Sequence, residues 1–185
     1  MSIEVNQIFD SNLLDQLDWT KHRAQYRDGI SPSNLPPGYT IRPLQSDDYS
    51  RGYCELLSNL TKVGDFTQEL FLKQFNQMRD SKLHYVTILH HQESDKVVGS
   101  ATLAVEHKFI HGAASRGRIE DVVVHPEHQG KQFGKVLLDL LILLAEQTNC
   151  YKLSLDCNEK AMPFYKKLNM DFVEDHRFMC IKFFD

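Results

Sequence analysis

The sequence has few cysteines, and they are not arranged as a disulfide framework or a metal site. The 185 residues include four, with no Cys-x-x-Cys pair and no metal-ligand spacing: Cys54, Cys150, Cys157 and Cys180. A chain of this length forms an adequate core without disulfides, so we expect free thiols in a reducing, cytoplasmic compartment.

The sequence also lacks a long apolar run. Its longest, Val136–Ala145, is interrupted by Asp139 and is too short to cross a bilayer. Met1–Asp10 has no apolar segment of the kind found in secretory signals. We expect a soluble protein whose membrane attachment is at most peripheral.

An excess of basic residues is missing as well. The formal net charge is −4, from 21 Lys and Arg against 25 Asp and Glu, which argues against a nucleic-acid-binding protein. A local basic pocket for a small anion remains compatible with this balance. With 42% hydrophobic and 25% charged residues, the composition is that of a soluble globular domain.

The first 38 residues differ from the rest of the chain. Leu13, Leu14 and Leu17 are spaced for one short helical turn, and Ser31–Gly38 is a proline-containing connector. We expect residues 1–38 to form an N-terminal arm that lies on the surface or on a partner subunit. Residues 39–185 then form the domain.

Periodicity predicts an α/β domain with the order β-α-α-β-β-β-α-β-α-β. A loop with Lys108, Arg116 and Arg118 is expected before the fourth strand, and Ser46–Asp48 is expected to cap the first helix. The expected strands are Tyr39–Leu44, Tyr85–Leu89, Val97–Glu106, Ile119–Val124, Tyr151–Cys157 and one within Phe172–Phe183. The expected helices are Tyr49–Leu60, a second that begins at Thr67, Phe133–Gln147 and Pro163–Leu168.

The segment Gln129–Gly134 joins the fourth strand to the long apolar helix. The first N–H groups of a helix have no internal acceptor and lie at its positive end, so this position suits an anion. Gly130 and Gly134 let the backbone approach a diphosphate, and Lys131 and Lys135 add positive charge. The segment matches neither a Walker A loop nor a dinucleotide G-x-G-x-x-G motif. By spacing alone, an ordinary glycine-containing turn fits equally well.

The order of motifs around this loop provides further information, because it resembles that of a known family. A strand, then Gln129-Gly-Lys-Gln-Phe-Gly134, a long apolar helix, a strand and Phe164-Tyr165 in a short helix together resemble the GNAT acetyltransferase superfamily. Its loop pattern is Arg/Gln-x-x-Gly-x-Gly/Ala, and this chain departs from it at Gln132. The resemblance implies a mixed, mostly antiparallel sheet with splayed strands and helices on both faces.

Further motifs are similar to those of glucosamine 6-phosphate N-acetyltransferases. They are Glu106–His111, Arg118–Val124, Cys150–Lys152, Leu155–Cys157 and Phe164–Lys167, within a match over roughly Tyr39 to Lys182. The resemblance implies acetyl transfer from acetyl-CoA to glucosamine 6-phosphate by direct attack in a ternary complex, as a step toward UDP-N-acetylglucosamine. The alternatives are another small amine or a peptide N-terminus as acceptor, and a non-catalytic acyl-CoA-binding module.

The resemblance also implies site residues. Tyr165 corresponds to the tyrosine that donates a proton to the departing sulfur, and Asp156 to a position whose carbonyl orients the amine. The expected acetyl-CoA ligands are Val122, Val123, Val124, Gln129, Gly130, Lys131, Gln132, Phe133, Gly134, Lys135 and Tyr165. The expected sugar-phosphate ligands are Thr61, Lys108, Phe109, Ile110, His111, Glu120, Asp121, Asp156 and Lys182.

In the family the last strand crosses to a second subunit, so a homodimer with shared sites is implied and Lys182 acts in the partner's site. We expect no metal, because His107 and His111 lack a HExxH pattern and His125 and His128 flank a proline in a loop. Glu120 and Asp121 are expected to point to opposite faces of a strand, which makes them a poor acid–base pair.

Overall fold

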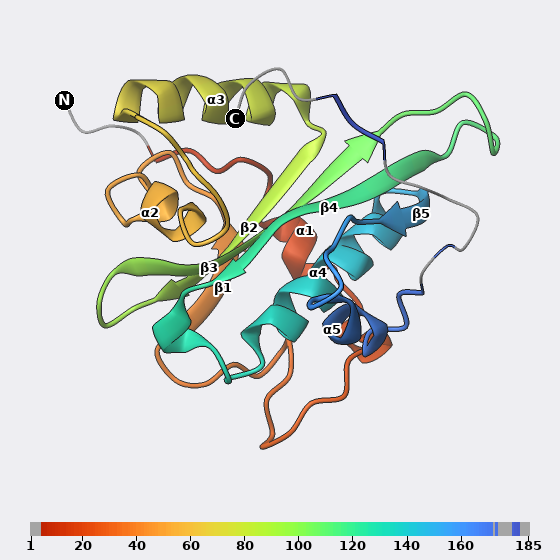
Figure 1. Cartoon of the computed structure of the whole chain (residues 1–185), viewed down its shortest axis with the longest axis horizontal. Coiled ribbons are helices and arrows are strands. Elements are labelled where there is room, and N and C mark those ends of the chain that lie inside the picture. The colour runs from red at the N-terminus through yellow and green to blue at the C-terminus, as the bar shows by residue number, and fades with distance from the viewer. Residues whose placement is uncertain (1–4, 172, 174–178, 182–185) are drawn as a thin grey trace.

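A five-stranded sheet forms the centre of the described structure (Figure 1). This computed structural model describes residues 5–171, 173 and 179–181. The strands lie in chain order, and all neighbours are antiparallel except the last pair, which is parallel. They are β1 (Tyr39–Pro43), β2 (His84–His91), β3 (Lys96–Glu106), β4 (Ser115–Val124) and β5 (Cys150–Ser154).

Helices cover both faces of this sheet. The long α4 (Phe133–Gln147) packs with α1 (Asn12–Asp15) on one face, and α5 (Met162–Lys166) lies against the same core. The other face carries α2 (Tyr53–Leu57) and α3 (Gln68–Ser81), whose Phe71 and Phe75 pack in a second core cluster. Two single 3-10 turns, η1 (Trp19–Lys21) and η2 (Pro126–His128), complete the described elements. The predicted class, mixed α/β with helices on both faces, is confirmed.

The predictions for helices α4 and α3 are confirmed. Helix α4 has the predicted bounds, and its residues Val136–Ala145 are all buried, as expected for a helix that is apolar on nearly every side. Thr67 caps α3, with its side chain accepting a hydrogen bond from the Leu70 amide at 3.2 Å.

Several local predictions were wrong. The helix expected at Tyr49–Leu60 spans only Tyr53–Leu57, and its cap is Gly52, with φ 82°, and not the Ser46–Asp48 segment. The strand expected to reach Cys157 ends at Ser154. Asp48 is fully buried because its carboxylate binds the Arg42 guanidinium at 2.8 Å and the Gln45 amide at 2.7 Å. Strand β4 begins at Ser115, so Arg116 and Arg118 lie on a strand and not in a loop. The final strand expected within Phe172–Phe183 falls mostly outside the described residues.

The N-terminal arm packs into the domain and does not lie only on its surface. Ile8, Leu14, Leu17 and Ala24 are all less than 9% exposed and belong to the core clusters. The Ile8 amide also donates to the Leu44 carbonyl at 2.9 Å. The expectation of a surface position was wrong because the apolar side chains of the arm are buried against the domain, where they are removed from water. In the described part of the chain, no helix has the length and apolarity needed to span a membrane.

Candidate active site

The segment Gln129–Gly134 forms the predicted loop between η2 and α4. The Gln129 side-chain amide donates to the Val124 carbonyl at 3.0 Å, which anchors the loop to the end of β4. Gly130 has φ 79°, a conformation that favours glycine. Within the described chain, the amides of residues 130–134 have no internal acceptor. The loop therefore offers several N–H donors at the positive end of a helix, as an anion site requires.

Gln132, where the superfamily pattern has glycine, adopts the left-handed backbone conformation that glycine would favour, with φ 65°. Its side-chain oxygen accepts from the Arg27 amide, and its side-chain nitrogen donates to the Arg27 carbonyl, both at 3.0 Å. The departure from the pattern thus leaves the loop conformation intact and adds a double link to the N-terminal arm.

Gly134 is needed for a different reason. A Cβ atom at this position would lie 3.1 Å from Cζ of Phe164 on α5. The absence of a side chain lets α5 pack closely against the start of α4, which brings the neighbouring Tyr165 toward the same end of the molecule.

The two loop lysines are held by neutral partners. Lys131 donates to the Tyr39 hydroxyl at 2.8 Å, and Lys135 donates to the Gln25 carbonyl at 2.7 Å. Because neither acceptor is a carboxylate, these contacts do not commit either lysine to an ion pair, and both side chains can turn to an anionic ligand.

Strands β4 and β5 separate along their length. Their pairing runs only from Ser115–Cys150 to Arg118–Ser154, so residues 119–124 have no partner on β5. On the other side, the pairing with β3 skips Asp121 and Val122, and Asp121 has φ 53°. This is a β-bulge, and it leaves the backbone of Asp121 and Val122 outside the regular ladder on both sides. The splayed strands implied by the resemblance are present, and this is where Val122–Val124 were expected to hold a thioester.

Arg118 joins two of the predicted site residues across this gap. Its guanidinium donates to a carboxylate oxygen of Glu120 through Nε and to one of Asp156 through a terminal nitrogen. The two carboxylates raise the pKa of Arg118 further above its ordinary value. Arg118 was expected in a basic loop and stands at the start of the motif Arg118–Val124, but it was assigned no role in the site. The signal that could have identified it is its spacing, because residues 118 and 120 of one strand share a face.

The bulge also changes the relation between Glu120 and Asp121. Their expected position on opposite faces assumed a regular strand, and the left-handed backbone at Asp121 breaks that alternation. Desolvation by the surrounding protein raises the pKa of Asp121, and the like charge of Glu120 raises it further. The regular alternation behind the expectation of opposite faces is therefore absent at Asp121, and whether the two carboxylates act in proton transfer stays a prediction.

Tyr165 lies on α5, half buried against the core cluster under α4. Burial raises the pKa of its phenol, and the nearby Cys157, in the segment after β5, adds to the effect. The hydroxyl therefore stays protonated at neutral pH. A neutral phenol close to the segment that follows β5 is suited to donate a proton to a departing thiolate.

The predicted phosphate ligands do not meet within one chain. Thr61 is exposed in the turn after α2, whereas Lys108–His111 form the tip of the β3–β4 hairpin on the other side of the molecule (Figure 1). At this tip Lys108 pairs with Glu106 at 2.5 Å, and the His111 ring stacks on Tyr151 with centroids 4.1 Å apart. Phe109 is fully exposed. Lys182 lies outside the described residues.

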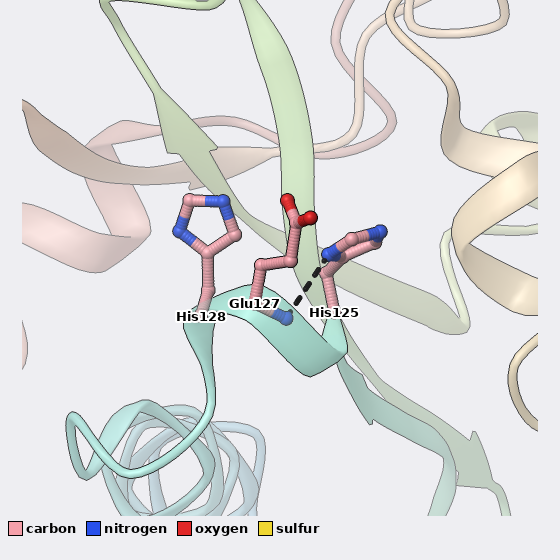
Figure 2. Close-up of side chains that lie close together, drawn as sticks. All are labelled: His125, Glu127 and His128. Carbon is pink, nitrogen blue, oxygen red and sulfur yellow. Dashed lines mark hydrogen bonds between the residues drawn. The ribbon is translucent and has the colours of Figure 1, made fainter.

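One group of side chains could hold a metal ion. His125, Glu127 and His128 extend side by side from η2, with potential ligand atoms within 4.8 Å of one another (Figure 2). The His128 Nδ1 atom is hydrogen-bonded to the Tyr39 hydroxyl at 2.9 Å, and the His125 Nδ1 accepts from the Glu127 amide. Burial lowers the pKa of His128, as do nearby Lys131, His91 and His125. The group is outside the gap between β4 and β5, so it is not placed to act on a thioester there.

Comparisons with known proteins agree with this geometry. Residues 41–170 match the family described as Acetyltransferase (GNAT) family. A probable glucosamine 6-phosphate N-acetyltransferase of Drosophila melanogaster is 43% identical over 166 residues, which cover 89% of this chain and 76% of the fly protein. Glucosamine 6-phosphate N-acetyltransferase 1 of Dictyostelium discoideum is 36% identical over 75% of this chain and 88% of its own length.

Solved structures give the same result. The crystal structure of glucosamine-6-phosphate N-acetyltransferase from Arabidopsis thaliana superposes with a TM-score of 0.73 at 32% identity, over 80% of this chain and 99% of that one. An acetyltransferase from Trypanosoma brucei gives 0.70 at 34% identity, over 77% and 99%. The chain belongs to the GNAT family of acetyltransferases, which use acetyl-CoA as co-substrate.

Proposed function

We propose that this protein transfers the acetyl group of acetyl-CoA to the amine of D-glucosamine 6-phosphate. The product, N-acetylglucosamine 6-phosphate, is a precursor of UDP-N-acetylglucosamine, and we place the reaction in the cytoplasm. The observation that carries the proposal is the gap between β4 and β5, which is bordered by the predicted substrate residues Glu120, Asp121 and Asp156. The names of relatives with 32% to 43% identity support the choice of substrate.

The residues around the gap suit a direct attack. Amides of Asp121 and Val122, which lie outside the ladder, can donate to the thioester carbonyl as negative charge develops on it. Asp156, held by Arg118, orients the amine. Glu120 and Asp121 can receive the amine proton through water, and Tyr165 returns a proton to the sulfur. Each step uses groups of the chain alone, so we propose that no metal takes part.

The free amides of residues 130–134 and the ammonium groups of Lys131 and Lys135 fit the diphosphate of acetyl-CoA. The packing of Phe164 on Gly134 supports a shared ligand, because it holds α5, which carries Tyr165, against the start of α4. In this arrangement the loop binds the co-substrate, and specificity for the acceptor depends on the gap.

We propose that the active unit is a homodimer with shared sites. Within one chain Thr61 and the Lys108–His111 tip lie apart, so a single subunit does not assemble the predicted phosphate site. The tip also exposes Phe109 completely and Ile110 by 58%, and Met179 and Ile181 near the C-terminus are 89% and 80% exposed. Apolar side chains exposed to this extent are typical of a surface that a partner covers.

The acceptor is tested by measuring thiol release from acetyl-CoA with glucosamine 6-phosphate, glucosamine, a polyamine and a peptide N-terminus. We expect the sugar phosphate to give a much larger kcat/KM than glucosamine, and a chelator to leave that rate unchanged. Equal rates with both sugars would refute the phosphate site. Faster reaction with another amine would assign a different acceptor, and acetyl-CoA binding without turnover of any amine would indicate a binding module.

The shared site is tested by mixing two inactive variants. If the Lys108–His111 tip of one chain completes the site that holds Tyr165 of the other, Tyr165→Phe and Lys108→Ala chains, each impaired alone, should form some sites with both groups intact when they are unfolded and refolded together. The mixture should regain activity above the sum of the two. Light scattering that shows a monomer, or a refolded mixture that shows no gain, would contradict the proposal.

A further inference from the structure

The N-terminal arm is fixed to the middle of α4 by a buried carboxylate. Asp139 is 1% exposed and lies among apolar side chains of that helix. It accepts hydrogen bonds from the Arg23 amide at 2.8 Å, from the Ala24 amide at 3.1 Å and from the Tyr26 hydroxyl at 2.6 Å. A buried carboxylate requires such donors, so these bonds hold residues 23–26 on the helix.

From this anchor the arm continues to the start of α4. Lys135 donates to the Gln25 carbonyl, and Gln132 bonds both the amide and the carbonyl of Arg27. These contacts place Arg27 directly beside the loop proposed to bind the diphosphate. A glycine at position 132 could not make them, so the side chain that departs from the superfamily pattern is the one that joins arm and loop.

The guanidinium of Arg27 is available for a ligand. The residue is exposed, and within the described chain its side chain makes no ion pair or hydrogen bond. With Lys131 and Lys135 it forms a group of three cations around the loop, on a protein whose net charge is −4. The loop amides suit the diphosphate, which leaves the ribose 3′-phosphate of coenzyme A as the remaining anionic group of the nucleotide.

We propose that residues 25–27 form one wall of the acetyl-CoA site and that Arg27 binds the ribose 3′-phosphate. This rests on the proposed use of acetyl-CoA, but not on the identity of the acceptor amine. Arg27 is therefore a specificity-determining residue for the nucleotide end of the co-substrate, and its planar guanidinium suits a phosphate.

The test compares acetyl-CoA with acetyl-dephospho-CoA, which lacks the 3′-phosphate. We expect the wild-type enzyme to have about a tenfold lower KM for acetyl-CoA, the effect of one good charge-assisted contact. Arg27→Ala should remove this preference by raising the KM for acetyl-CoA alone, with kcat unchanged, and Arg27→Lys should restore part of it. Gln132→Gly should weaken the same preference by releasing the arm.

The matched control is Arg23→Ala. The Arg23 guanidinium pairs with Glu146 at 3.3 Å, at the far end of α4, so its loss should leave the preference intact. Calorimetric titration with coenzyme A and dephospho-coenzyme A repeats the comparison without any amine, so the result stands even if the acceptor is a different one. Equal affinities of the wild type for both ligands, or an unchanged preference in Arg27→Ala, would overturn the proposal.

Discussion

Replacing Asp139 by alanine tests how firmly the N-terminal arm is attached. The substitution leaves three donors in the interior without their acceptor: the amides of Arg23 and Ala24 and the hydroxyl of Tyr26. Leaving a buried donor unpaired costs about 1–3 kcal/mol. For three donors the sum is about 3–9 kcal/mol. Because the arm can partly detach and let water reach these groups, we expect the free energy of unfolding to fall by about 4 kcal/mol, near the lower end of that range.

Urea unfolding measures this loss. For a chain of this size 4 kcal/mol corresponds to a fall in Tm of roughly 8–16 °C. The control is Tyr26→Phe, which removes only the 2.6 Å hydroxyl bond and leaves both amides paired. It should cost about 1–2 kcal/mol.

The urea dependence carries separate information. If the arm remains folded on the domain in Asp139→Ala, the m-value is unchanged, and if the arm detaches in the native state, m falls because less surface is exposed on unfolding. A loss under about 1 kcal/mol for Asp139→Ala, with m unchanged, would refute the reasoning, because an unpaired donor alone costs that much.

Three further predictions concern the site. Tyr165→Phe should lower kcat by about 100-fold with little change in the KM for acetyl-CoA, since proton donation contributes roughly 10² to 10⁴; an unchanged kcat would remove this role. Gly134→Ala should reduce kcat more than stability, because its Cβ would meet Phe164 at 3.1 Å and displace α5, while alanine itself favours a helix by about 1 kcal/mol; full activity would show that α5 tolerates the shift. The raised pKa of Asp121 means that its carboxyl ionises at a higher pH than the ordinary 3.8. If the carboxylate receives the amine proton, kcat/KM should rise with pH through that raised pKa, and Asp121→Asn should abolish this rise; a pH profile identical to the wild type would exclude Asp121.

Helices were predictable from the sequence where the helical spacing of apolar residues continued for several turns. Helix α4 was predicted to the residue because its apolar positions fit a helical repeat from Phe133 onward. Strand β4 was predicted to begin four residues late, because Ser115–Arg118 alternate small and charged residues and resemble a polar loop. In the folded chain Ser115 and Gly117 are buried, and Gly117 packs against Leu103 and Leu153, whereas Arg116 and Arg118 are half-buried.

The sequence indicated which residues belong to the site, but not which side chains contact one another. Sequence reasoning placed Glu120 and Asp156 on two different expected strands, whereas their link through Arg118 depends on where β4 and β5 stop pairing. The left-handed backbone of Asp121 has no local signal in the sequence, and that of Gln132 is marked only by the glycine of the superfamily pattern. Both lie at points where tertiary contacts, a bulge and a bond to the arm, determine the backbone.

The burial of α4 has a consequence for how the co-substrate binds. A helix with apolar contacts on nearly every side has no freedom to slide or tilt, so the N–H groups at its first turn point in fixed directions before any ligand arrives. Such preorganisation removes the conformational entropy that a flexible phosphate loop would lose on binding. The flexible pantetheine chain of acetyl-CoA therefore adjusts to the protein, and loop backbones in free and bound states should superpose within about 1 Å.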